Sequence, residues 1–387
     1  MADALPSSWR QTTLGEVAAP VPNAIVDGPF GSNLKLSDYV DEGVPVLQGK
    51  NITNDKFRWF DVRFISDRKA RELKRSSVRA GDILIIKIGS IGYSAIVEDL
   101  NGFDFAIIPA NLAKVTPDTT KVDLGYLHKW LTSVDAKRYL IGVASKTAQP
   151  ALSLGKIKSL PLPLPPLAEQ RWIAEVLARA EALRAKRRAA LAQLDSLTQS
   201  LFLDLFGDPI SNPRKWPQEN LETFFHFRTG KLDSNAAVTS GQYPFFTCSR
   251  EDFRIDTFAF DCEALLLAGN NASADYSVKH YKGKFNAYQR TYVITLRDKH
   301  NSYDYSRFVL EHRLTELKRI SKGTNTKYLT LELLNRIRVP VPPIELQREF
   351  ARRARVVEKL KTAQRASLGE LDALFATLQH RAFRGEL

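Results

Sequence analysis

A proline-led segment occurs twice in the chain, and this duplication constrains the fold more than any other feature. The first copy begins Pro161-Leu-Pro-Leu-Pro-Pro-Leu-Ala-Glu-Gln170, and the second begins Val339-Pro-Val-Pro-Pro-Ile-Glu-Leu-Gln347. The copies align without a gap, and Gln170 and Gln347 are 177 positions apart, as are all other matched residues. A constant offset over such a length indicates an internal duplication.

Each copy predicts a long helix. Apolar residues recur at intervals of three and four after the prolines, close to the 3.5-residue repeat of a coiled coil. About 40 helical residues extend for about 60 Å, too far to bury the apolar stripe on a small domain. We expect the two copies to pair with each other; two separate coiled coils with other chains are the alternative. The residues predicted to pair the helices are Leu177, Leu183, Leu191, Leu194, Leu201, Leu360, Leu368, Leu371 and Leu378.

Composition narrows the class of protein. A chain of 387 residues is expected to hold two or three domains. It has no long apolar run and no signal-peptide core, and its only cysteines, Cys248 and Cys262, lack metal-ligand spacing, so we expect a soluble cytoplasmic protein. The net charge of +13 is spread over the chain without a basic tail. It predicts an anionic partner that binds a folded surface.

The segments on either side of the first long helix predict two related globular domains, which we call heads. Trp9 and Leu14 have the same spacing as Trp216 and Leu221. Both regions mix short apolar strands, glycine turns and short helices, which indicates an α+β (mixed) fold with two α/β domains. The predicted division is 1–160 for the first head, 161–206 for the central helix, 207–338 for the second head and 339–387 for the C-terminal helix.

Polar loops supply the candidate site of the first head. The loop from Asp27 to Lys35 contains two glycines, which let backbone N–H groups approach a ligand, but it lacks the Lys-Ser/Thr pair of a Walker loop. Further polar loops follow the buried strand 81–88 and precede the proline segment at 144–149. The candidate DNA-binding residues of this head are Ser32, Lys35, Lys87, Ser90, Asn111, Lys146 and Gln149.

The second head offers matching loops with different side chains. Residues 228–231 take the place of the glycine-rich loop, and the strand and turn at 264–271 correspond to those at 83–92. Polar groups on such loops can read base edges, while lysines and arginines bind the phosphate backbone. The candidate DNA-binding residues of this head are Arg228, Lys231, Asn270, Asn271, Gln289, Arg290, Thr324 and Asn325.

No motif in the chain predicts catalysis. The sequence lacks the Asp/Asn-Pro-Pro-Tyr/Phe motif of amino-methyl transfer, a Gly-x-Gly cofactor fingerprint and a Walker motif. The six histidines are scattered without the spacing of metal ligands. We therefore predict no enzymatic activity, no cofactor and no metal on this chain.

Four motifs together resemble the specificity subunit of type I restriction–modification systems. They are the Gly28–Ser32 loop, the segment Gly43–Ile52, the segment Leu162–Gln170, and the run of Phe206-Gly-Asp-Pro with Trp216. The resemblance implies two target-recognition domains separated by two long antiparallel conserved helices. Each domain would recognise one half of a bipartite, asymmetric site in double-stranded DNA.

The resemblance also implies the partners. The helices would dock two methyltransferase subunits, and restriction subunits with translocase and endonuclease activity would then join. S-adenosylmethionine, ATP and Mg²⁺ would be bound by those partners and not by this chain.

One alternative belongs to another class of protein. In it, the chain is a non-enzymatic coiled-coil adaptor whose globular heads bind protein rather than DNA. A third reading, a self-contained endonuclease or methyltransferase, predicts activity of the purified chain alone. Binding to DNA weakens steeply as salt rises, because counterions are released, so salt dependence separates the first two.

Overall fold

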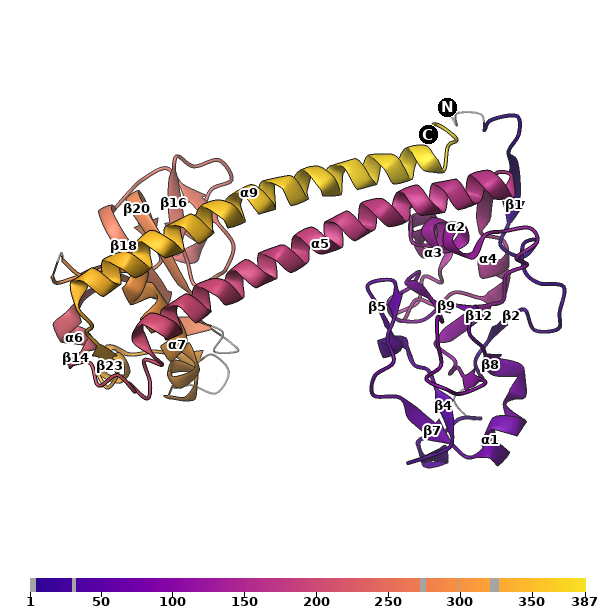
Figure 1. Ribbon diagram of the computed structural model, residues 1–387, viewed down its shortest axis with the longest axis horizontal. Coiled ribbons are helices and arrows are strands. Elements are labelled where there is room, and N and C mark those ends of the chain that lie inside the picture. Colours follow the sequence, from indigo (N-terminus) through magenta and orange to yellow (C-terminus); the bar gives the residue numbers. More distant parts are fainter. Residues whose placement is uncertain (1–4, 30–32, 272–275, 299, 321–326) are drawn as a thin grey trace. The chain divides into compact units, whose positions relative to one another are not determined.

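The chain divides into two compact units, and each long helix contributes to both. The computed structural model describes residues 5–29, 33–271, 276–298, 300–320 and 327–387. Unit 1 comprises Met1–Lys186 and Leu368–Leu387, and unit 2 comprises Arg187–Ser367. The boundaries fall within the duplicated helices α5 (Leu167–Phe206) and α9 (Ile344–Ala382), drawn in magenta and yellow in Figure 1. Neither these nor any other described helix has the length and hydrophobicity needed to cross a membrane.

Unit 1 carries a head built on two small sheets. An antiparallel sheet has the strand order β10-β9-β12-β2, and a mixed sheet has the order β3-β7-β4-β11-β8. The elements are β1 (Arg10–Thr13), β2 (Ile25–Asp27), β3 (Tyr39–Val40), β4 (Val44–Val46), β5 (Ile52–Thr53), β6 (Lys56–Phe57), β7 (Arg63–Ile65), α1 (Asp67–Glu72), β8 (Ser77–Val78), β9 (Ile83–Ile86), β10 (Ser94–Ile96), β11 (Ala106–Ile107), β12 (Leu112–Val115), α2 (Leu124–Leu131), α3 (Val134–Val143), α4 (Leu154–Lys158) and β13 (Pro161–Leu164).

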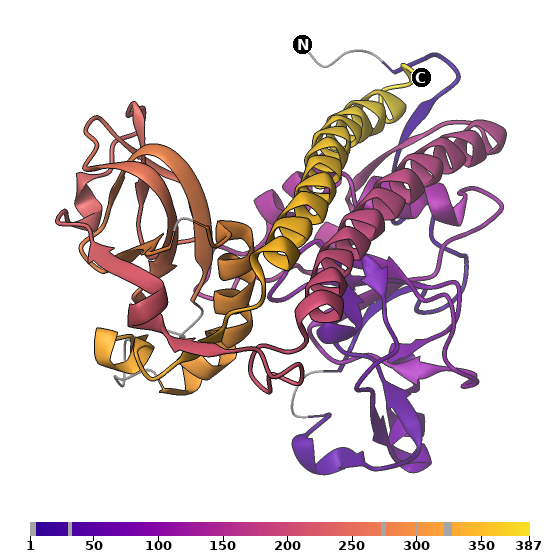
Figure 2. The ribbon, with the colours of Figure 1, turned by 60° about the vertical axis from the view of Figure 1, so that its left-hand side comes forward.

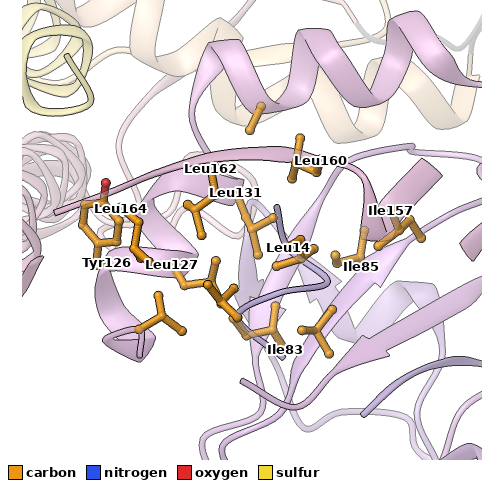
Figure 3. Packing of buried hydrophobic residues seen from close by; sticks show 14 of the residues in the cluster. Leu14, Ile83, Ile85, Tyr126, Leu127, Leu131, Ile157, Leu160, Leu162 and Leu164 are labelled. Atoms are coloured by element: carbon orange, nitrogen blue, oxygen red, sulfur yellow. The ribbon is translucent and has the colours of Figure 1, made fainter. Parts of the chain in front are cut away.

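The main core of unit 1 lies between these helices and the antiparallel sheet. Ile83 and Ile85 of β9 face Leu127 and Leu131 of α2, and all four are essentially buried (Figure 3). The end of the chain completes this core, because the ring of Phe383 lies 5.5 Å from that of Tyr126. One face of β9 thus belongs to this cluster, while Leu84 and Ile86 on its other face belong to a second hydrophobic cluster.

Unit 2 carries a head built on one six-stranded sheet. The strand order is β15-β21-β18-β20-β16-β17, and Figure 2 shows its curved strands in salmon and orange. A long antiparallel pair dominates it, with Phe260 opposite Phe285 and Leu267 opposite Val278. The elements are β14 (Gln218–Asn220), α6 (Leu221–Phe224), β15 (Phe225–Thr229), β16 (Tyr243–Phe246), β17 (Phe253–Ile255), β18 (Phe260–Ala268), β19 (Asn270–Asn271), β20 (Val278–Ala287), β21 (Thr291–Leu296), α7 (Tyr303–Ile320), β22 (Lys327–Tyr328), α8 (Leu331–Leu334) and β23 (Arg338–Pro340).

A buried glutamine fastens the start of each long helix to its head. In unit 1, Gln170 accepts from the backbone N–H of Asp123 (2.8 Å) and donates to the carbonyl of Pro165 (2.8 Å). In unit 2, Gln347 accepts from the N–H of Ser302 (3.0 Å) and donates to the carbonyl of Pro342 (3.0 Å). The duplicated Pro-Pro-x-x-x-Gln motif is thus a joint, because one side chain satisfies polar groups of both the helix start and the head.

The two long helices bury a strict heptad stripe, and its positions differ in part from the prediction. The stripe advances by alternate steps of four and three in both helices and keeps the 177-residue offset. Its members are Ile173, Leu177, Ala180, Arg184, Arg187, Leu191, Leu194, Thr198, Leu201 and Leu205 in α5, and Phe350, Ala354, Val357, Lys361, Gln364, Leu368, Leu371, Phe375, Leu378 and Ala382 in α9. The prediction was wrong for Leu183 and Leu360, which are 55% and 48% exposed, because the repeat places Arg184 and Lys361 on the stripe instead.

Polar pairs on this stripe join α5 to α9 within each unit. In unit 1, Arg184 forms an ion pair with Asp372. In unit 2, Lys361 forms an ion pair with Asp195 (2.9 Å), and only 6% of the lysine side chain is exposed. Arg184 and Lys361 are duplicated positions, as are Asp195 and Asp372. The helices therefore pair antiparallel in both units, through the same contact.

Candidate nucleic-acid interface

Five segments of the unit 1 head meet at the C-terminal ends of β2 and β9, and we call this region loop end 1. The segments are 27–29, 47–51, 87–92, 108–112 and 145–152. Backbone hydrogen bonds join them: the N–H of Lys87 donates to the carbonyl of Asn111 (2.9 Å), and the N–H of Leu152 donates to the carbonyl of Lys87 (2.9 Å). The N–H of Gly28 donates to the carbonyl of Leu112 (3.2 Å).

Gly28 allows the glycine-rich loop to lie against the neighbouring chain. A Cβ atom at this position would lie 2.2 Å from the carbonyl oxygen of Pro109. Any side chain would collide with backbone that cannot move aside, so only glycine permits this contact. The loop therefore leaves β2 at a fixed place beside residues 108–112.

Lys87 is held by an ion pair in the centre of loop end 1. Its Nζ lies 2.6 Å from Oδ2 of Asp27, and the two side chains are 13% and 20% exposed. The guanidinium of Arg75 approaches the other carboxylate oxygen at 3.8 Å. Lys87 thus connects β9 to the start of the glycine-rich loop in the unbound protein.

The other predicted residues of this head are distributed around that pair. Asn111 is half-buried, and its Nδ2 is 3.1 Å from where a Cβ of Gly49 would lie. Exposed positions at loop end 1 are occupied by Ser90, Lys146 and Gln149, and Lys35, further along the glycine-rich loop, is exposed as well. Ser32 lies outside the described residues.

The unit 2 head has a corresponding loop end 2, formed by segments 229–233, 246–249, 269–271, 287–291 and 327–329. The N–H of Gly269 donates to the carbonyl of Arg290 (2.9 Å), and the N–H of Leu329 donates to the carbonyl of Gly269 (2.8 Å). A Cβ at Gly230 would lie 1.6 Å from the carbonyl oxygen of Ala287. A glycine contact again fixes the loop that follows the first strand of the sheet.

The predicted residues of the second head differ in their surroundings. The side chains of Lys231, Gln289 and Arg290 are exposed, and Gln289 Nε2 donates to Asp233 Oδ2 (3.4 Å). Asn270 and Asn271 pair with Tyr328 and Lys327 as a short strand, where the sequence predicted a turn. Thr324 and Asn325 lie outside the described residues.

Arg228 lies on a strand and not in the predicted loop. It belongs to β15 opposite Val293, and its guanidinium carbon is 5.0 Å from the centre of the Phe260 ring. The loop assignment failed because the alternating pattern of Phe225-His-Phe-Arg-Thr229 extends the strand up to Gly230.

Two residues at the loop ends are absent from the predicted set. Asp27 holds Lys87, and Cys248 donates from its thiol to the carbonyl of Arg290 (3.4 Å). Asp27 was detectable, since it opens the glycine-rich loop. Cys248 carried no signal, because its position depends on the parallel pairing of β16 with β20.

The surroundings of the two loop ends contain no metal-binding cluster in the described part of the chain, where no three His, Cys, Asp or Glu side chains come together suitably. Besides the carboxylates of Asp27 and Asp233 and the thiol of Cys248, the polar groups at the loop ends are amides, hydroxyls, lysines and arginines. These are the groups that contact bases and phosphates.

Comparison with known proteins identifies the family. The family described as "Type I restriction modification DNA specificity domain" matches residues 6–193 and 213–368. The chain therefore belongs to this family, with one matched region for each head.

Curated relatives and solved structures agree with this assignment. The EcoDI specificity subunit of Escherichia coli is 54% identical over 82 residues, covering 21% of this chain and 18% of that protein. The EcoBI specificity subunit of the same species is 27% identical over 224 residues, covering 56% of this chain and 44% of that protein. The chain thus spans less than half the length of these two relatives. The putative MjaX specificity subunit of Methanocaldococcus jannaschii is 20% identical over 99% of this chain and 94% of that protein.

Two solved structures share the fold. The type I restriction–modification S subunit from M. genitalium has a TM-score of 0.61 at 15% identity, covering 97% of this chain and 96% of that one. A chain from a structural study of complex assembly and conformational transition in the type I R-M system has a TM-score of 0.60 at 18% identity, covering 99% of this chain and all of that one.

Proposed function

We propose that the chain is a DNA-recognition subunit in which each head reads one half of a bipartite, asymmetric site. The observation that carries this proposal is the repetition of one loop end in both heads with different side chains on it. A duplicated frame with diverged loops suits two different half-sites. The amide and guanidinium groups at these loops suit base edges, and the exposed lysines suit phosphates.

The helices suit a role in assembly and spacing. α5 and α9 leave Leu183 and Leu360 about half-exposed at duplicated positions, where a docked partner would cover them. We propose that two methyltransferase subunits bind the helices and that restriction subunits join them. Catalysis, S-adenosylmethionine, ATP and Mg²⁺ would belong to those partners, and the complex would act on DNA in the cytoplasm.

Methylation mapping tests this function directly. The chain is produced in cells together with a cognate methyltransferase, and modified bases are located by long-read sequencing. The expected result is one split motif, with two short defined halves around a fixed unspecified spacer. The motif should disappear when this chain is deleted and return when it is restored.

The same experiment identifies failure. An unchanged methylation pattern after deletion would contradict the proposal and would support an adaptor whose heads bind protein. Methylation or cleavage by the purified chain alone would instead indicate a self-contained enzyme.

A further inference from the structure

The two loop ends can be compared residue by residue through their hydrogen bonds. Asn111 and Arg290 each stand immediately before the second strand of the sheet, β12 or β21. The carbonyl of each accepts from the residue that follows the neighbouring strand, Lys87 in unit 1 and Gly269 in unit 2, both at 2.9 Å. Asn111 and Arg290 therefore occupy the same position in the two heads.

The residue packed beside that position differs between the heads. In unit 1 this residue is Gly49, which follows β4, the strand that pairs in parallel with β11. In unit 2 it is Cys248, which follows β16, the strand that pairs in parallel with β20. Gly49 leaves room for the Asn111 amide, which lies half-buried beside it. In unit 2 the thiol of Cys248 lies against the Arg290 carbonyl, and the Arg290 side chain is exposed.

A second exchange keeps the frame intact around this position. Lys87 with its Asp27 partner is replaced in unit 2 by Gly269, and Ala113 on the adjacent strand is replaced by Tyr292. The Tyr292 ring lies 3.0 Å from where a Cβ of Gly269 would be, and its hydroxyl donates to the carbonyl of Leu329 (2.9 Å). Unit 1 has a large residue followed across the strands by a small one, and unit 2 has the reverse order. The backbone arrangement is therefore preserved, while the side chains available to a ligand differ.

Both side chains at this position retain their bonding capacity. Within the described residues, neither the Asn111 amide nor the Arg290 guanidinium has a hydrogen-bond partner, whereas the nearby Lys87 and Gln289 do. Both groups are accessible to solvent, so a ligand can take the place of water without breaking a protein hydrogen bond.

We propose that this shared position is a specificity-determining position of each head, with Asn111 reading an adenine in one half-site and Arg290 reading a guanine in the other. The inference rests on the proposed function. The asparagine amide offers one donor and one acceptor, which match adenine N6 and N7. The guanidinium offers two parallel donors, which match guanine O6 and N7.

The test compares single variants in the full-length chain assembled with its methyltransferase subunits. Once the split motif of the parent is known, binding is measured by competition against duplexes altered at one base pair at a time. For Arg290→Ala, we expect discrimination at one guanine of a single half-site to fall about 5- to 150-fold. For Asn111→Ala, we expect the same loss at one adenine of the other half-site.

Each half-site serves as the control for the other, and Arg336→Ala, just after α8, supplies a matched control. Arg336 is a largely exposed arginine of the same head that lies outside the loop segments and pairs with Glu332, so its substitution should leave discrimination unchanged. Arg290→Lys keeps the charge without the planar fork, so it should lose guanine discrimination while retaining the salt dependence of binding. Thermal unfolding of each variant confirms that it is folded.

Three outcomes would overturn the inference. They are unchanged discrimination in folded Arg290→Ala and Asn111→Ala, loss at both half-sites from one substitution, or loss at a base other than guanine or adenine. Because the parent still shows its split motif in these cases, the proposed function would stand. Absence of a split motif in the parent would instead contradict the proposed function itself.

Discussion

Individual glycines decide where the loops of each head begin. For Gly28→Ala, the added methyl would lie 2.2 Å from the Pro109 carbonyl oxygen, so the loop must move. We expect a loss of at least about 2 kcal/mol in the free energy of unfolding of unit 1. Chemical denaturation of the full chain, followed by fluorescence, measures this loss.

Gly142→Ala is the matched control, because nothing lies within 4 Å of its Cβ position and it sits in helix α3. Replacement of a helical glycine by alanine should be neutral or stabilising by up to about 1 kcal/mol. Equal effects of the two substitutions would show that the close contact at Gly28 does not constrain the loop.

A partly buried histidine gives unit 1 a pH dependence. Burial lowers the pKa of His128 below its usual value of 6.5, although its Nε2–H donates a hydrogen bond to the Ser94 carbonyl (3.3 Å). The unfolded chain therefore binds this proton more readily, so the stabilisation is complete above about pH 6.5 and declines as the pH falls below that value. His128→Gln should reduce this decline. The free energy of unfolding is measured for the parent chain and for His128→Gln between pH 7.5 and 5. A difference between the two that stays constant over this range would contradict the assignment.

At the scale of elements, the glutamine joints hold each long helix to its head. Gln347→Met keeps a similar volume but leaves the Ser302 N–H and the Pro342 carbonyl without their partner. We expect a cost of about 2–4 kcal/mol in the unfolding of unit 2. Gln193→Met, on the exposed side of α5, should change stability by less than about 0.5 kcal/mol. A similar small change at both sites would remove the structural role assigned to Gln347.

The heptad register of the helices makes a second prediction at this scale. Lys361→Ala removes a buried ammonium that pairs with Asp195 and Glu358, whereas Leu360→Ala trims a side chain that is half-exposed. We expect the lysine substitution to cost about 1–3 kcal/mol and the leucine substitution clearly less. The reverse order, measured by denaturation of the two variants, would restore Leu360 to the helix interface.

At the scale of the whole molecule, the charge of +13 should appear as salt-dependent binding. The exposed cations predicted at the loop ends are Lys35, Lys146, Lys231 and Arg290, with Arg228 on the adjoining strand. If Arg290 reads a base and the other four contact phosphates, the logarithm of the DNA-binding constant should fall with that of salt concentration at a slope of about −3 to −4.

Titration of a fluorescent duplex over a range of salt concentrations measures this slope. Lys231→Gln should reduce its magnitude by about one, while Arg68→Gln on α1, a surface arginine outside the loop ends, should leave it unchanged. A slope near zero would favour protein-binding heads.

Sequence reasoning succeeded where a signal is local or repeated. The duplicated prolines and glutamines marked the helix starts, and the constant offset located matched heads and helices. The predicted helix interface was wrong at Leu183 and Leu360, because these leucines precede the stripe positions Arg184 and Lys361 in the sequence. Selection by hydrophobicity alone picks the leucine instead of the cation. Sequence reasoning also failed at Arg228, where strand length is fixed by pairing with β21 and not by the local loop pattern.

The sequence by itself determined the duplication, the two long helices, the mixed α/β heads and the loops that carry polar groups, because periodicity and prolines act through neighbouring residues. Only the tertiary structure decided which of those loop residues meet. Strand pairings between distant segments bring Lys87 to Asp27. They also give Asn111 and Arg290 the same position in their separate heads, and they place Cys248 in unit 2 where unit 1 has Gly49. Such pairings are set by the packing of the whole head, and a sequence pattern a few residues long carries no record of them.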